Sequence, residues 1–180
     1  MFETAVTCRM LFKCTLKVRK ALKLRDQDLS IDIGKGGNEF NHWYCNMFFL
    51  DRRKCLIWMH GTTLFTVLAP GVYQNDFRQL GEVFRSRAKA VLAATDGISE
   101  ANINLLLDEG PDYFAKTDSR SVLGSMNDHI LGCKYHAEAG FESIDFTALN
   151  YNLNRTPMGA IGYKYASESL KFLLNGEAKG

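Results

Sequence analysis

The chain has 180 residues, of which 46% are hydrophobic and 12% aromatic, and it contains only three prolines. This composition excludes a disordered or fibrous chain and suits one folded domain over residues 1–180, large enough to bury a core. No apolar run approaches the roughly 20 residues that a membrane-spanning helix needs, and the first residues do not read as a secretory leader. We therefore expect a cytoplasmic protein with no membrane partner.

The net charge of +2 conceals an uneven distribution of charged residues. Residues 1–25 carry seven Lys and Arg against one Glu, and residues 51–90 carry seven against three acidic residues. Residues 94–150 are the reverse, with ten acidic residues against three basic ones. Such asymmetry is typical of a surface that binds nucleic acid, although charge runs are also common on solvated faces.

The first segments of the chain predict a strand, a short basic helix and a loop. Residues 7–15 alternate between the two faces with a period of two, which is typical of a half-buried strand. Residues 16–24 place their apolar side chains at helical spacing among several lysines. The glycines and asparagines of residues 26–41 then indicate a loop.

Residues 42–69 give the strongest structural signal. Two short polar linkers separate three apolar runs, over 43–50, 55–59 and 64–69. Linkers of this length suit hairpins, so the segment predicts an antiparallel meander. If Arg52 and Arg53 form its first two-residue turn, Leu50 faces Cys55 across the hairpin. Because both faces of the strands are apolar, we expect the sheet to be covered on both sides.

The second half of the chain is predicted to be mainly helical. Apolar spacing and capping residues predict helices over 76–96, 99–109, 126–136 and 166–175, with a brief strand at 113–115. The expected fold class is therefore α+β: a single domain with a mainly antiparallel sheet around the 42–69 meander and about four to five packed helices.

Residues 116–128 are the densest stretch of small polar chemistry. They hold four hydroxyls, two carboxylates, two cations, an amide and a glycine between a predicted strand and a predicted helix. Backbone N–H groups at the start of a helix attract anions. We predict an anion site at this strand-to-helix junction, suited to the phosphate of a nucleotide or nucleic acid, with the ligands Lys116, Ser119, Arg120, Ser121, Gly124 and Ser125.

Two other interpretations of this stretch stay open. Ser125 and Asp128 fit a helix-capping box, in which case the stretch is structural. If the site is catalytic, Ser125, Asn127 and Asp128 are the candidates for orienting a substrate or acting as a base. The four histidines and five cysteines match no metal-binding spacing, so we expect no metal or cofactor.

Several segments together resemble a known family. The most specific is Arg-Ser-Val-Leu-Gly-Ser-Met-Asn-Asp at 120–128, and the others lie at 12–17, 43–49, 53–55, 115–117 and 153–159. They resemble a family of bacterial and mobile-element proteins catalogued only as a domain of unknown function, over roughly residues 10–175. The resemblance implies no activity, fold or cofactor, and it adds Asn154 and Arg155 to the candidate ligand-binding residues.

These observations support three hypotheses about function. The leading one is a nucleic-acid- or nucleotide-interacting protein with its anion site at 116–128, assisted by basic side chains from residues 13–25 and 78–89. The second is an enzyme that acts on a phosphorylated substrate or phosphodiester at the same site. The third is a protein-binding inhibitor or accessory factor of a mobile element or phage, whose charged faces meet a complementary partner.

Overall fold

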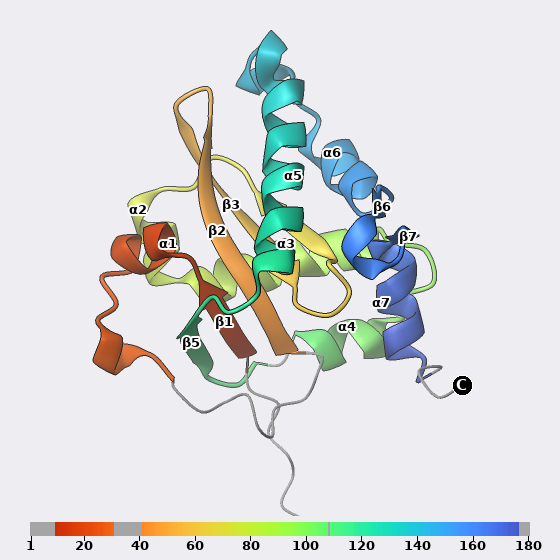
Figure 1. Ribbon diagram of the computed structural model, residues 1–180, viewed down its shortest axis with the longest axis horizontal. Helices are drawn as coiled ribbons and strands as arrows, with labels where there is room; N and C mark the ends of the chain where they lie inside the picture. Colours follow the sequence, from red (N-terminus) through yellow and green to blue (C-terminus); the bar gives the residue numbers. More distant parts are fainter. Residues whose placement is uncertain (1–9, 31–40, 108, 177–180) are drawn as a thin grey trace, which may run out of the picture.

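The computed structural model of the chain describes residues 10–30, 41–107 and 109–176 (Figure 1). Its centre is a five-stranded sheet with the strand order β4-β3-β2-β1-β5. The strands are β1 (Met10–Cys14), β2 (His42–Leu50), β3 (Arg53–His60), β4 (Thr66–Ala69) and β5 (Asp112–Lys116). The predicted strand over 7–15 is thus found as β1, while residues 7–9 lie outside the described ranges.

The sheet combines an antiparallel half with a parallel half. β2, β3 and β4 form the predicted antiparallel meander. β1, however, pairs in parallel with β2 on one side and with β5 on the other. The α+β class is confirmed, but the prediction of a mainly antiparallel sheet holds only for the meander. The reason is that β1 reaches β2 through a crossover that includes α1 (Leu16–Ala21), and crossovers join parallel strands.

The turn of the first hairpin lies one residue earlier than predicted. Leu50 pairs with Arg53, so the turn consists of Asp51 and Arg52, which have φ angles of 44° and 65°. Positive φ at both positions is the type I′ geometry, which matches the twist of the flanking strands. Each residue of β2 therefore pairs two positions earlier in β3 than predicted, and the same side chains stay on each face.

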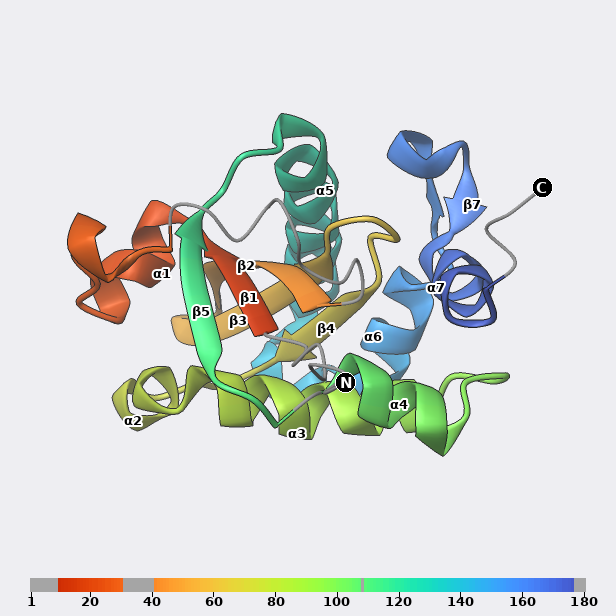
Figure 2. The same cartoon turned by 90° about the horizontal axis from the view of Figure 1, so that it is seen from below.

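Helices cover both faces of the sheet, as the apolar strands predict. Figure 2 shows α3 (Leu80–Ala93) and α4 (Glu100–Leu106) on one side of the sheet and α5 (Arg120–His136) on the other. Two further helices, α6 (Phe146–Leu153) and α7 (Ala166–Leu174), lie beside the β4 edge. With α1 and α2 (Gln74–Arg78), the described part of the chain holds seven α-helices.

Alternation along the strands builds two hydrophobic cores. The core between the sheet and α3 includes Trp43, Trp58 and Phe84, all fully buried. The core between the sheet and α5 includes Ile57 and Met126, together with apolar residues of α6. Successive strand residues point to opposite faces, so each apolar run of the meander contributes to both cores.

Helix α5 begins six residues before its predicted start. Ser119 is the N-cap, and its Oγ accepts a hydrogen bond from the backbone N–H of Val122 at 3.3 Å. Val122 is itself buried against the sheet, so the helix has to begin ahead of it to present this side chain. The predicted capping box of Ser125 and Asp128 is therefore wrong, because both residues lie inside the helix.

The other predicted helices are found with changed limits. The one over 76–96 is divided into α2 and α3, because Gln79 between them has non-helical backbone angles (φ −120°, ψ 37°). The one over 99–109 is α4, with Ser99 as its N-cap, and the one over 166–175 is α7. Residues 113–115 lie in β5.

Short elements complete the fold. A two-stranded sheet of β6 (Pro157–Met158) and β7 (Lys164–Tyr165) lies between α6 and α7. The 3-10 helices are η1 (Asp26–Asp28), η4 (Ala137–Ala139), η5 (Phe141–Ser143) and η6 (Gly159–Ile161). Across the described ranges, no helix combines the length and the apolar character needed to span a membrane.

Candidate functional site at the junction of β5 and α5

The predicted anion-binding stretch lies where two parallel strands end side by side. β1 and β5 pair in register, with Cys14 opposite Lys116, so their carboxyl ends lie together. The chain then departs in two directions: Val18 of α1 packs into the core on the α3 side, whereas α5 packs on the other side. In open α/β sheets, ligands bind outside the carboxyl ends of neighbouring parallel strands whose connections diverge in this way.

An acidic side chain of the protein occupies the centre of this junction. Asp118 accepts a hydrogen bond from Nζ of Lys13 at 2.7 Å and another from the hydroxyl of Tyr44. Burial favours a higher pKa for Asp118, but the hydrogen bonds from Lys13 and Tyr44 outweigh it and lower the pKa below the usual value. Burial, reinforced by the bond to Asp118, raises the pKa of Tyr44. At neutral pH the carboxylate is therefore ionised and the phenol protonated.

Two of the predicted ligands are engaged within the protein. The Oγ of Ser119 serves as the cap of α5. The Nζ of Lys116 lies 3.1 Å from Oδ1 of Asp26 in η1, and both side chains are exposed. An exposed ion pair of this kind contributes little free energy, so Lys116 can exchange Asp26 for another anion at small cost.

Arg120 and Ser121 remain available to a ligand. They are the first two residues of α5, both are exposed, and no hydrogen bond or ion pair joins their side chains to another described residue. The backbone N–H groups of the first turn add a partial positive charge at the same place. Of the predicted set, these two residues best retain the chemistry of an anion site.

The remaining predicted residues on α5 do not converge with them. Ser125 is buried against the sheet, whereas Asn127 and Asp128 are exposed. An added Cβ at Gly124 would have no neighbour within 4 Å, so nothing in the described structure approaches this glycine closely. The three residues considered for catalysis therefore do not face a common point.

Asn154 lies at the other edge of the sheet, where it supports β4. Its Oδ1 accepts from the backbone N–H of Thr66 at 2.7 Å, and its Nδ2 donates to the Thr66 carbonyl at 2.8 Å. Asn150, one turn earlier in α6, accepts from the N–H of Leu68 at 2.9 Å and also donates to the Thr66 carbonyl. The two buried amides thus satisfy backbone groups that an edge strand otherwise leaves unpaired.

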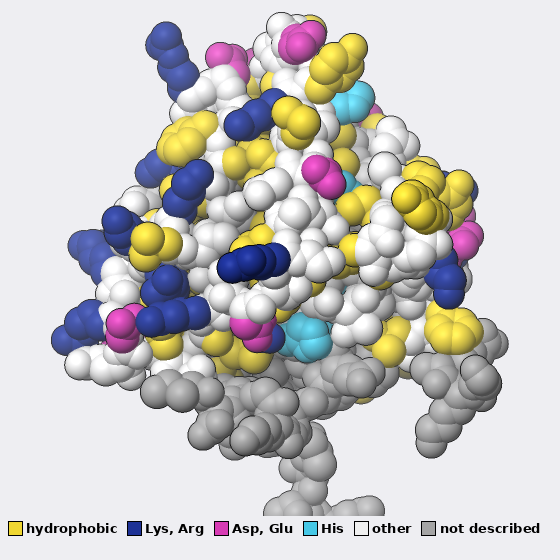
Figure 3. All heavy atoms as spheres, in the orientation of Figure 1, with side chains coloured by type: hydrophobic (Ala, Val, Ile, Leu, Met, Phe, Trp, Pro, Cys, Tyr) yellow, Lys and Arg dark blue, Asp and Glu magenta, His cyan; other side chains and the backbone are white. Residues whose placement is uncertain are grey.

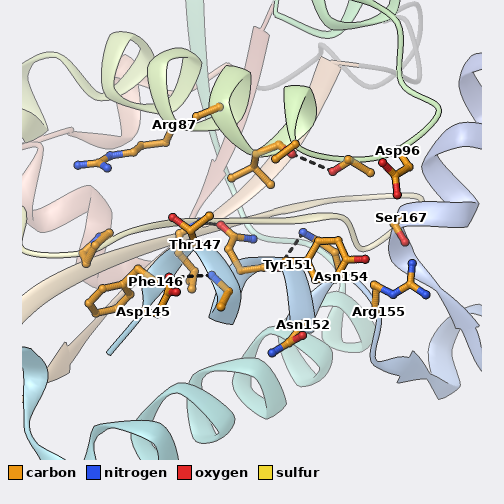
Figure 4. Close-up of a pocket in the computed structure, with 18 of the residues that line it drawn as sticks. Arg87, Asp96, Asp145, Phe146, Thr147, Tyr151, Asn152, Asn154, Arg155 and Ser167 are labelled. Atoms are coloured by element: carbon orange, nitrogen blue, oxygen red, sulfur yellow. Dashed lines mark hydrogen bonds between the residues drawn. The ribbon is translucent and has the colours of Figure 1, made fainter. Parts of the chain in front are cut away.

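Arg155, the last predicted ligand, borders a cavity that the sequence analysis did not predict. The cavity has a volume of about 400 Å³ and lies between α3, α6 and α7, with β4 contributing to its wall (Figure 4). The guanidinium of Arg155 lies 5.4 Å and 5.7 Å from the ring centres of Tyr151 and Tyr165. Asn150 and Asn154, four residues apart, are the sequence signal for a buried polar contact here. A cavity between three helices has no corresponding pattern of residue spacing in the sequence.

Basic side chains gather on one side of the molecule. Figure 3 shows Lys and Arg concentrated where α1 and the hairpin between β2 and β3 lie. The part of this surface next to the junction, called the basic face below, consists of Lys13, Lys17, Lys20, Lys116 and Arg120. The expected contribution from residues 78–89 stays a prediction, because α3 lies across the sheet from α5 but on the same side as α1.

His129 belongs to the core rather than to a site. Its Nδ1 lies 3.0 Å from Oγ1 of Thr66, and its Nε2 lies 3.3 Å from Sδ of Met158. Burial lowers the pKa of His129 to about 4, although the neighbouring Asp128 acts in the opposite direction. Within the described ranges, no three His, Cys, Asp or Glu side chains lie together as ligands for a metal ion.

Comparison with known proteins gives one relationship. No curated protein and no solved structure matches the chain. A family match covers residues 11–169. It includes the β5–α5 junction, the first four residues of α7 and all of the five-stranded sheet except Met10. The chain belongs to this family, DUF6933, which is described as a domain of unknown function.

Proposed function

We propose that this protein binds nucleic acid through the basic face. The observation that supports the proposal most directly is the parallel pairing of β1 and β5, which brings the basic segment 13–20 beside residues 116–120. Two segments that are about a hundred residues apart in sequence thereby bring their cations to the same end of the sheet. A polyanion interacts with many such charges at once and displaces the counterions around its phosphates.

The state of the charged groups favours an extended polyanion over a single bound nucleotide. Lys17, Lys20 and Arg120 are exposed and form no ion pair with another described residue. At the centre of the junction, by contrast, Asp118 holds Lys13, and Ser119 is used as the cap of α5. A nucleotide phosphate at this point would have to displace Asp118, whereas a nucleic-acid backbone can cross the exposed cations around it.

The experiment is a salt titration of binding. Fluorescence anisotropy with a labelled 20-nucleotide single strand and the corresponding duplex, as DNA and as RNA, should give an affinity that falls steeply between 50 and 300 mM KCl. Arg120→Ala and the double substitution Lys17→Ala and Lys20→Ala should weaken binding and lower the slope by about 0.7 to 0.9 for each phosphate contact that is lost.

A matched control uses two exposed lysines outside the basic face. Lys134 lies in the last turn of α5 and Lys164 in β7, so replacing both by Ala removes the same charge as the double substitution in α1. The control should bind nucleic acid nearly as the unmodified protein does. Binding that does not depend on salt, or an equal loss in the control, would contradict the proposal.

A further inference from the structure

The cavity beside Arg155 is built like a binding site for a small molecule. Its walls are mostly apolar and include Leu68 of β4, Val91 of α3 and Phe146 of α6. Its volume of about 400 Å³ lies within the range of roughly 300 to 1,000 Å³ that is typical of ligand pockets. Apolar wall surface favours a ligand whose body is also apolar.

A buried hydroxyl without a partner lies at one end of this cavity. Ser167 in α7 is only 4% exposed, it lines the cavity, and its Oγ forms no hydrogen bond within the structure. Its backbone N–H, in contrast, donates to the Asn154 carbonyl at 3.0 Å, which fixes the residue in place. Buried polar atoms are nearly always satisfied in folded proteins, and of the buried atoms without a partner in the described structure, the Ser167 hydroxyl is one that belongs to a residue lining the cavity.

Charged groups surround the same end. Figure 4 shows Ser167 together with Arg155 and Asp96, while Arg87 and Asp145 lie at the opposite end. Lys171 of α7 also lines the cavity. None of these charged side chains forms an ion pair with another described residue. The rings of Tyr151 and Tyr165 hold the guanidinium of Arg155 in place without using its N–H donors.

We propose that this cavity binds a small organic carboxylate with an apolar body. The carboxylate would lie between the guanidinium of Arg155 and the hydroxyl of Ser167, and the body would pack against Leu68, Val91 and Phe146. A guanidinium matches the two oxygens of a carboxylate. Arg155, Lys171 and Asp96 together give the cavity end one net positive charge, which suits a singly charged head group. The site lies at the β4 edge, away from the basic face, so it does not depend on the proposed function.

Octanoate and its neutral counterpart octanamide are the probes. Isothermal titration and amide chemical shifts of the ¹⁵N-labelled full chain should show octanoate binding at least about tenfold more tightly than octanamide, because a hydrogen bond to a charged group is the stronger one. The largest shifts should fall on amides that line the cavity, including that of Ser167. Arg155→Gln should abolish the preference for octanoate, whereas Arg78→Gln, far from the cavity, should preserve it.

Ser167→Ala separates a ligand-binding role from a structural one. Removal of an unpartnered buried hydroxyl should raise the melting temperature of the unliganded protein by about 2 °C and at the same time weaken the binding of octanoate.

Ala90→Trp, which fills the cavity, should block the binding of both probes, and Ala93→Trp, on the same helix but outside the cavity, should leave binding intact. Absence of saturable octanoate binding, or octanoate binding that survives Arg155→Gln, Ser167→Ala and Ala90→Trp, would overturn the proposal.

Discussion

The carboxylate of Asp118 lies 2.7 Å from Nζ of Lys13, at the point where β1 and β5 end together. The pair joins the two segments of the basic face, because Lys13 belongs to β1 and Asp118 lies two residues after the end of β5. It also places a fixed negative charge in the middle of a surface that we propose for a polyanion. An internal anion of this kind competes with an external one for the same lysine.

Asp118→Asn should therefore strengthen nucleic-acid binding. The substitution removes one negative charge from the basic face and releases Lys13, so both the affinity at 100 mM salt and the salt slope should increase. Because Asp118 is 61% exposed, loss of the ion pair should lower the free energy of unfolding by no more than about 1 kcal/mol. Anisotropy titrations at several salt concentrations measure the first effect, and urea unfolding measures the second. A large loss of binding in a folded variant would show that Asp118 helps to bind the ligand.

Gly124→Ala tests whether this glycine serves a ligand or only the helix. An added Cβ would meet nothing within 4 Å, and glycine in a helix interior is less favourable than alanine. The substitution should stabilise the protein by about 0.5 to 1 kcal/mol and leave nucleic-acid binding unchanged. Weaker binding without a loss of stability would restore the predicted role of Gly124 at the anion site.

Gly81→Ala is the contrasting case, since Gly81 also lies in a helix. A Cβ at this position in α3 would overlap with the carboxylate of Asp112 in β5, which pairs with Arg85 at 2.6 Å. The substitution should therefore destabilise the protein, by about 1 to 3 kcal/mol. Urea unfolding of both glycine variants under the same conditions should give changes of opposite sign.

Much of the fold could be predicted because local patterns specify it. Three apolar runs with linkers of hairpin length predict the meander of 42–69. Ser99, a favoured N-cap residue, predicts the start of α4. The start of α5 was ambiguous, because Ser119 and Ser125 are both good caps. Only the burial of Val122, a tertiary fact, favours the earlier one. The parallel pairing of β5 with β1 is likewise non-local, and no pattern within either segment predicts it.

The site could be predicted only in part, for the same reason. The density of polar groups predicts an anion site at residues 116–128, and the structure places Arg120 and Ser121 together at the start of α5. Spacing along the chain could not reveal that Ser125 faces the core or that Asn154 lies at the far edge of the sheet. The cavity needs three helices to form, so only the packed structure contains it.

The stability of the protein should fall in mildly acidic solution because of His129. Its pKa is lowered to about 4 in the folded state, against an ordinary value of about 6.5 in the unfolded chain. Between these two values the unfolded state binds the proton more readily, so acidification through this window favours unfolding. The expected loss between pH 7 and pH 4.5 is about 2 to 3 kcal/mol. Urea unfolding at several pH values should show this slope.

Two substitutions separate this effect from other titrations. His129→Gln removes the titrating ring, so its stability should vary much less over the same pH range, even if the variant is less stable at pH 7. His136 is on the same helix but exposed, and His136→Gln should keep the full pH dependence. Asp118, whose pKa is lowered, loses its contribution only when the pH falls to still lower values. An unchanged slope in His129→Gln would mean that another group causes the acid sensitivity.

Replacing the asparagines that support β4 should cost stability in a definite order. Asn154→Ala leaves the N–H of Thr66 without its side-chain partner, and Asn150→Ala does the same to the N–H of Leu68. Each substitution also removes one of the two amide donors to the Thr66 carbonyl. Each buried backbone group that loses its partner costs about 1 to 3 kcal/mol, so both variants should be clearly destabilised. Asn154→Ala should be the more severe, because it also removes the donor to the Asn150 carbonyl.

Asn152, exposed between them, is the control, and Asn152→Ala should change the free energy of unfolding by less than about 0.5 kcal/mol. Equal, small effects at all three positions would mean that water replaces the amides at the β4 edge, and that this edge is open to pairing with another strand.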